Sequence, residues 1–183
     1  MKTLRLCLLL FGSGLLLLGS QCKKSDSPPP LTELQKLPPI TQGGLNTFGC
    51  LINGTAFLPG GGGIFNQTLS VQYDPTFQGG NLVITAKQFI TTSQSIQIGI
   101  HGDTINTVGN YNLKLHSKYS VVYYDDPKAC YFGTLYNTPI SGILTVNRFD
   151  TITRIISGTF SFKVATAACG TIDVTDGRFD VTY

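Results

Sequence analysis

Residues 157–164 read Ser-Gly-Thr-Phe-Ser-Phe-Lys-Val, and this short stretch decides the fold class. Phe160, Phe162 and Val164, together with Gly158, occupy every second position, and polar residues stand between them. Side chains alternate between the two faces of an extended chain. The pattern therefore predicts a β-strand with one buried face and one solvated face.

The same alternation extends outward from this stretch over most of the chain. Alternating segments lie at 69–73, 82–86, 96–100, 111–115 and 179–183, and apolar, β-branched or aromatic runs lie at 119–124, 129–136 and 143–149. Turn-forming pairs separate them, among them Asn53-Gly54, Asp126-Pro127 and Asp176-Gly177. We therefore predict an all-β fold, a single antiparallel β-sandwich, with a β-barrel-like closure as the alternative.

The N-terminal part of the chain has a different character. Lys2 and Arg5 precede an apolar run at 6–18, which is shorter than the roughly 20 residues that a membrane-spanning helix needs. A basic start and a short apolar run are typical of a secretory signal, so we predict a signal peptide at 1–21. Residues 22–46 contain five of the nine prolines and predict a stiff, extended linker, which leaves 47–183 for the all-β domain.

A single cysteine, Cys22, follows the apolar run, with Gln21 before it and a polar segment after it. This arrangement resembles a bacterial lipoprotein signal, in particular the relaxed signals of Bacteroidota. The resemblance implies that Cys22 is lipidated and that its acyl chains hold the protein to membrane lipid. It also implies a location in the bacterial cell envelope, at the outer membrane, on its periplasmic or surface face.

The two ends of the predicted domain carry a family resemblance. Residues 46–59 read Asn-Thr-Phe-Gly-Cys-Leu-Ile-Asn-Gly-Thr-Ala-Phe-Leu-Pro, and the chain closes with the segments 156–162 and 172–181. The first segment is similar to the opening, and the other two to the close, of a Bacteroidota lipoprotein family of the DUF6252 type. The middle matches by pattern only. The resemblance implies an envelope location and this fold, but no activity, because the family has none established.

Three cysteines remain in the predicted domain, Cys50, Cys130 and Cys169. An exported, oxidising setting favours disulfides, and three thiols allow three single pairings. Cys130 and Cys169 lie beside turns, whereas Cys50 lies in an apolar strand, where a free thiol packs as a small hydrophobe. We therefore predict a Cys130–Cys169 disulfide.

The charged residues argue against several functions. From residue 47 onward, eight basic and eight acidic residues balance, so we predict no nucleic-acid partner. The pair Asp125-Asp126 indicates a turn. Three aspartates near the C-terminus lack the spacing of an EF-hand loop, which favours a hairpin or bulge over a calcium site: Asp173, Asp176 and Asp180. We predict no catalytic residue, no metal and no cofactor.

The favoured function is a non-catalytic structural or binding module of the cell envelope, with an envelope protein or a glycan as partner. One alternative is an envelope hydrolase or metal-dependent enzyme that uses His101, Asp103 and His116. The other is a carbohydrate-binding module that uses the aromatic region 119–136, where exposed rings would stack on sugars. Its candidate ligand-binding residues are Tyr119, Tyr123, Tyr124 and Tyr131. Ordinary cross-strand packing also accounts for these tyrosines.

Overall fold

The computed structural model describes residues 28–64, 66–133, 138–167 and 169–183. The predicted signal peptide and Cys22 lie outside the described residues. Residues Leu31–Tyr183 form one compact unit. No helix in the described part of the chain combines the length and the apolar character that crossing a bilayer requires.

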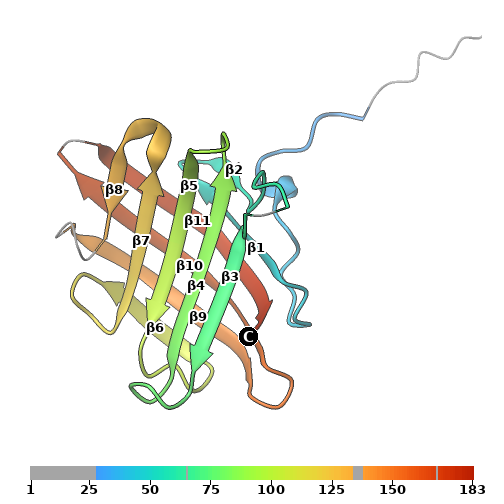
Figure 1. Cartoon of the computed structure of the whole chain (residues 1–183), viewed down its shortest axis with the longest axis vertical. Coiled ribbons are helices and arrows are strands. Elements are labelled where there is room, and N and C mark those ends of the chain that lie inside the picture. The colour runs from blue at the N-terminus through green and yellow to red at the C-terminus, as the bar shows by residue number, and fades with distance from the viewer. Residues whose placement is uncertain (1–27, 65, 134–137, 168) are drawn as a thin grey trace, which may run out of the picture. The chain divides into compact units, whose positions relative to one another are not determined.

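The compact unit is an antiparallel β-sandwich, as predicted (Figure 1). One sheet has six strands in the order β2-β1-β11-β10-β9-β6, and the other has five in the order β3-β4-β5-β7-β8. In the described residues, two 3₁₀ turns accompany them, η2 (Leu34–Lys36) and η3 (Asp126–Lys128). The strands are β1 (Thr47–Ile52), β2 (Thr55–Phe57), β3 (Leu69–Asp74), β4 (Asn81–Phe89), β5 (Ser95–Gly102), β6 (Gly109–Lys114), β7 (Tyr119–Asp125), β8 (Cys130–Phe132), β9 (Ile140–Asp150), β10 (Ile155–Thr166) and β11 (Gly170–Thr182).

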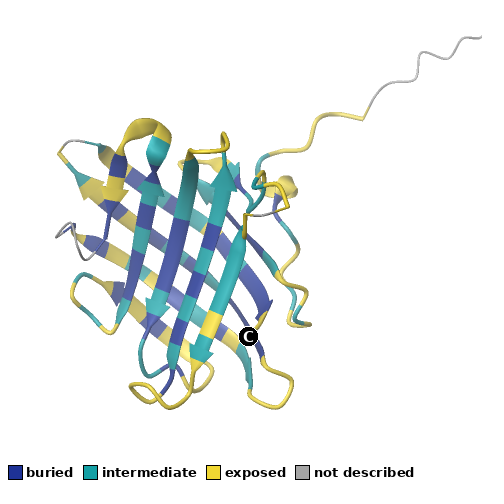
Figure 2. Ribbon diagram, viewed as in Figure 1, coloured by how far each residue is buried: buried dark blue, intermediate teal, exposed yellow. Residues whose placement is uncertain are grey.

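The core lies between the two sheets and follows the period-two pattern of the sequence (Figure 2). Phe160, Phe162 and Val164 on β10 are buried, and they face the interior with Ile84 on β4 and Ile98 on β5. Burying side chains of this size contributes about 1.5–3 kcal/mol each. The alternation thus assigns each residue to the core or to the outer face of its sheet.

The hairpin of β1 and β2 turns where Asn53-Gly54 predicted. Both residues have positive φ, 48° and 80°, which the two central positions of a type I′ turn require. β2 is the edge strand of the six-stranded sheet, whereas β1 is an inner strand, because it also pairs with the last strand, β11. The N-terminal and C-terminal strands are therefore neighbours within one sheet.

A disulfide joins the two sheets. Cys130 on β8 is bonded to Cys169 in the turn before β11, with 5.9 Å between the two Cα atoms. This confirms the predicted pairing. Cys50 is a free thiol that is fully buried in the core, and this burial raises the pKa of the thiol.

Residues 31–46, here called the strap, pack against the sandwich. We expected this segment to belong to an extended linker, but the compact unit begins at Leu31, ahead of the expected start at Thr47. Leu37 is only 7% exposed, and the Glu33 carboxylate accepts a hydrogen bond of 2.9 Å from the backbone N–H of Ala56 on β2. Asn46 accepts hydrogen bonds from both the N–H and the hydroxyl of Thr182.

The carboxylate of Asp180 is the main contact of the strap. Its neighbours on β11, Phe179 and Val181, point into the core, so Asp180 points outward, yet it is only 1% exposed because the strap covers it. Its two oxygens accept hydrogen bonds of 2.7 Å from the Thr41 hydroxyl and of 2.7–3.3 Å from the N–H groups of residues 43, 44 and 45. Burial alone would raise the pKa of Asp180, but these hydrogen bonds outweigh it and lower the pKa.

Candidate functional site

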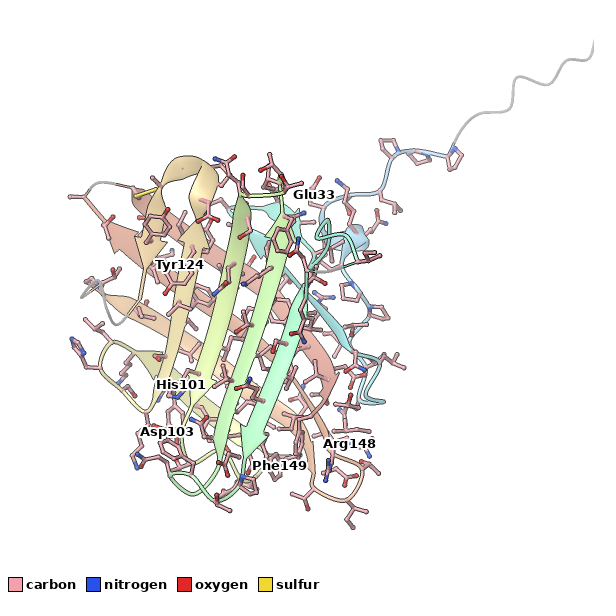
Figure 3. The ribbon with its side chains drawn as sticks, in the orientation of Figure 1. Glu33, His101, Asp103, Tyr124, Arg148 and Phe149 are labelled. Carbon is pink, nitrogen blue, oxygen red and sulfur yellow. A yellow bond between two sulfur atoms is a disulfide. The ribbon has the colours of Figure 1, made fainter. Side chains whose placement is uncertain are left out.

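The outer face of the five-stranded sheet is the candidate site. The residues of β4, β5 and β7 that alternate with core residues point away from the sandwich, and most of them are partly exposed (Figure 2). Figure 3 shows this sheet in front, with Tyr124 toward one end of it and His101 and Asp103 toward the other. The face carries two groups of side chains, which are described separately below.

The first group is an aromatic pair formed by Tyr124 and Tyr131. These residues are directly opposite each other on β7 and β8. Their ring centroids lie 5.8 Å apart and the ring planes are tilted by 58°. Tyr131 is 38% exposed and Tyr124 is partly exposed, so the pair presents aromatic surface to solvent. A cross-strand aromatic pair stabilises the sheet edge while leaving part of each ring accessible.

A groove of about 350 Å³ lies beside this pair. Its other walls are polar and come from the neighbouring strands and from η3. The Asp126 carboxylate accepts hydrogen bonds from both the N–H and the hydroxyl of Ser95, at 3.0 and 3.2 Å, which fixes its position. The groove is lined by Lys87, Ser95, Gln97, Tyr124, Asp126 and Tyr131.

A second hollow, of about 330 Å³, adjoins the first across Lys87, which lines both. It is lined by Asn66, Gln67, Ser70, Thr85, Lys87 and Phe89. Together the two hollows offer an ammonium group, amides, hydroxyls and a carboxylate next to aromatic rings. Such a surface can stack against an apolar ring face and hydrogen-bond the hydroxyls around it.

The other two predicted ligand-binding tyrosines point inward and do not belong to this surface. Tyr123 is 1% exposed, and its hydroxyl donates a hydrogen bond of 3.1 Å to Asp125. Burial, and after it the nearby carboxylate of Asp125, raises the pKa of Tyr123. Tyr119 packs against Tyr111 with 5.0 Å between ring centroids, and its hydroxyl is 2.7 Å from that of Thr104. Tyr136, at the end of the aromatic region, lies outside the described residues.

The second group lies where β4 begins and β5 ends. The side-chain amide nitrogen of Asn81 is 2.9 Å from His101 Nε2 and 2.7 Å from Asp103 Oδ1. His101 Nε2 and Asp103 Oδ1 are 3.5 Å apart. His101 and Asp103, two of the three residues named for the alternative enzyme, are thus neighbours, and Asn81, which contacts both, was not among the candidate residues. Because one amide contacts both groups, it orients them.

His116 does not join this pair in a metal-binding group. It lies in the turn between β6 and β7, with a φ of 52°. Over the described ranges, no three or more His, Cys, Asp or Glu side chains are placed to hold a metal ion together. Two of the C-terminal aspartates have separate partners. Asp173 forms an ion pair of 3.0 Å with Lys163 on the surface, whereas Asp180 accepts hydrogen bonds from the strap.

The groove residues that sequence reasoning missed are Lys87, Ser95, Gln97 and Asp126. Gln97 faces Tyr124 in the register of β5 and β7, and Lys87 faces Gln97 in the register of β4 and β5. Only the strand pairing brings these residues together. The sequence did allow the tyrosines to be divided into inward-facing and outward-facing residues, because adjacent strand residues such as Tyr123 and Tyr124 point to opposite faces.

A family model described as "Domain of unknown function (DUF6252)" matches residues 67–181. This range is more than half of the chain and includes every residue that lines the groove beside the tyrosine pair. No curated protein and no solved structure matches the chain.

Proposed function

Because the chain belongs to the DUF6252 family, a family without an assigned function, we propose a function from the residues of this chain. In this proposal, the protein is a lipid-anchored module of the bacterial cell envelope that binds a ligand without transforming it. The groove beside Tyr124 and Tyr131 is the single observation that carries the binding role.

The anchor is supported by the N-terminal sequence. A basic start, the apolar run 6–18 and Cys22 follow one another as in the lipoprotein signals of Bacteroidota. Two or three acyl chains on Cys22 would hold the protein stably to the outer membrane, whereas one chain gives only reversible binding. Labelling of growing cells with a radioactive or clickable fatty acid tests this. We expect the native chain to incorporate the label, and a Cys22→Ser chain that still incorporates it would overturn the anchor.

A glycan is the ligand class that the groove fits best. A sugar ring has an apolar C–H face, which stacks on aromatic rings, and a rim of hydroxyls, which require hydrogen-bond donors and acceptors. Tyr124 and Tyr131 offer the first, and Lys87, Gln97 and Asp126 offer the second, within one groove. The neutral balance of charge over the domain supports an uncharged ligand of this kind over a polyanion.

The hydrogen bonds of two buried carboxylates support a non-catalytic role. Asp180 holds the strap, and the buried Asp125 accepts hydrogen bonds from Tyr123 and from the N–H of Lys128. These carboxylates thus serve the fold, whereas a glycosidase needs two carboxyl groups that face a substrate across one cleft.

A glycan array followed by calorimetry tests the binding role. We expect the native chain to bind a subset of neutral glycans and both Tyr124→Ala and Tyr131→Ala to weaken binding roughly ten-fold, which corresponds to about 1.4 kcal/mol. Phe77→Ala is the matched control, because Phe77 is an exposed aromatic residue, 55% accessible, in the turn between β3 and β4. Absence of binding by the native chain, or equal binding by both tyrosine variants, would overturn the proposal.

A further inference from the structure

The docked strap shortens the part of the chain that separates the domain from the membrane. If residues 22–46 formed a free linker, Cys22 could lie up to about 85 Å from Thr47, at roughly 3.3–3.6 Å per residue. Because the compact unit begins at Leu31, only the nine steps from Cys22 to Leu31 remain. Fully extended, they reach about 30 Å. This argument rests on the lipid anchor of the proposed function.

The strap enters the sandwich at one particular end. Glu33 contacts Ala56 on β2, and the hollow beside the strap is lined by Lys36, Leu58 and Pro59 among others. The loop that follows β2 continues to the end of β4, where Gly60 exchanges hydrogen bonds with residues 87 and 89. Strap entry, residues 58–64 and the turn between β4 and β5 are therefore neighbours, and Figure 1 shows this region at the upper end of the molecule.

This end exposes large apolar side chains at the surface. Ile64 in the loop after β2 is 92% exposed, and Ile90 in the turn between β4 and β5 is 51% exposed. Leu31 and Leu34 at the strap entry are 62% and 49% exposed. Moving apolar side chains from water into a membrane interface lowers the free energy. A segment that is already tethered beside the membrane also loses less entropy on contact than a free protein does.

We propose that this end of the sandwich, here called the entry end, rests on the lipid leaflet that holds Cys22, with Leu31, Leu34, Ile64 and Ile90 in contact with it. The opposite end, with the exposed Phe77 in the turn after β3 and the exposed Ile152 in the turn after β9, then points away from the membrane. β4 alone, nine residues long, spans about 27 Å along the sandwich. With the opposite end on the leaflet, the nine steps from Leu31 to Cys22 would therefore have to run almost fully extended to reach the membrane. The short linker therefore favours the entry end.

Site-specific fluorescence on the lipidated full chain tests this orientation. Single cysteines replace Ile64 or Ile90 at the entry end and Phe77 or Ile152 at the opposite end, and each is labelled with the environment-sensitive dye NBD. The native thiols do not compete, because Cys50 is buried and Cys130 is bonded to Cys169. Each labelled protein is bound to vesicles of phosphatidylethanolamine and phosphatidylglycerol that carry a headgroup-region nitroxide quencher.

We expect quenching at Ile64→Cys and Ile90→Cys to be about two-fold or more stronger than at Phe77→Cys and Ile152→Cys, because only the entry end lies within reach of the interface. Equal quenching at the two ends, or the reverse order, overturns the orientation. Flotation of the same vesicles is measured in parallel. If the native chain fails to float, the anchor fails and the orientation with it, whereas flotation with the wrong quenching order overturns the orientation alone.

Discussion

Replacing Asp180 by asparagine is the sharpest test of how the strap is held. The carboxylate accepts hydrogen bonds from the Thr41 hydroxyl and from three consecutive backbone N–H groups. Asparagine keeps the shape and one oxygen, but it loses the charge and turns an NH₂ group toward donors. Losing one charge-assisted hydrogen bond costs about 1.5–3 kcal/mol, and a buried donor without a partner costs about 1–3 kcal/mol.

The loss is limited, because the strap can leave the sheet and return its N–H groups to water. We therefore expect Asp180→Asn to lower the free energy of unfolding by about 3 kcal/mol. The chain has no tryptophan, so urea unfolding is followed by far-ultraviolet circular dichroism. Asp173→Asn is the matched control on the same strand, since Asp173 is 46% exposed and pairs with Lys163. An exposed pair of this kind is worth about 0–1 kcal/mol.

Limited trypsin digestion separates release of the strap from general loosening. Lys36 lies in η2 within the strap, and we expect cleavage after it to accelerate in Asp180→Asn but not in Asp173→Asn. A double-mutant cycle with Thr41→Val should give a coupling of about 1 kcal/mol, because the two side chains share one hydrogen bond. Unchanged stability, or destabilisation without faster cleavage after Lys36, would refute this account of the strap.

Three further predictions concern the core and its charges. Replacing Cys130 and Cys169 together by serine should lower the free energy of unfolding by about 4 kcal/mol, on the chain-entropy model for a loop of this length. Comparing the urea midpoint of this variant with that of the native, disulfide-bonded chain measures the loss. Cys50 should resist alkylation by iodoacetamide in the folded protein and react once urea unfolds it, because burial raises the pKa of its thiol; rapid modification of the native chain would contradict its position in the core. The pKa of Asp180 is lower in the folded chain than in the unfolded chain. Its contribution to stability is therefore present above about pH 4 and is lost as the pH falls through the lowered value. Urea titrations at several pH values should show this loss in the native chain but not in Asp180→Asn.

The parts of the fold that were predictable from the sequence are those that depend on neighbouring residues. Alternation over residues 157–164 placed Phe160 and Phe162 in the core, because the side-chain period of a strand is local. Asn53-Gly54 likewise specified its turn through the φ values of two residues. The Cys130–Cys169 disulfide followed from the contrast between thiols at turns and a thiol inside an apolar strand.

The parts that were not predictable depend on residues far apart in the chain. The prolines of residues 22–46 predicted an extended linker, but residues 31–46 include the turn η2 and pack on the sandwich, and this docking depends on Asp180, 139 positions from Thr41. The groove has the same origin, because Lys87 reaches Tyr124 only through the register of three strands. The aromatic region was recognised as a unit, yet its residues divide between the core and the surface.

The pairing of β1 with β11 has a consequence for how the protein is made. β1 pairs with β11, and the strap contacts Asp180 and Thr182 on that strand, so these N-terminal segments cannot complete their packing until Gly170–Thr182 has been made. Contacts between chain ends this distant form slowly, because most of the chain must be ordered first. The five-stranded sheet lies within residues 69–132 and can pair earlier, whereas the six-stranded sheet stays open between β1 and β10 until β11 is made. A product truncated before Gly170 would therefore leave β1 and β2 without a sheet to join.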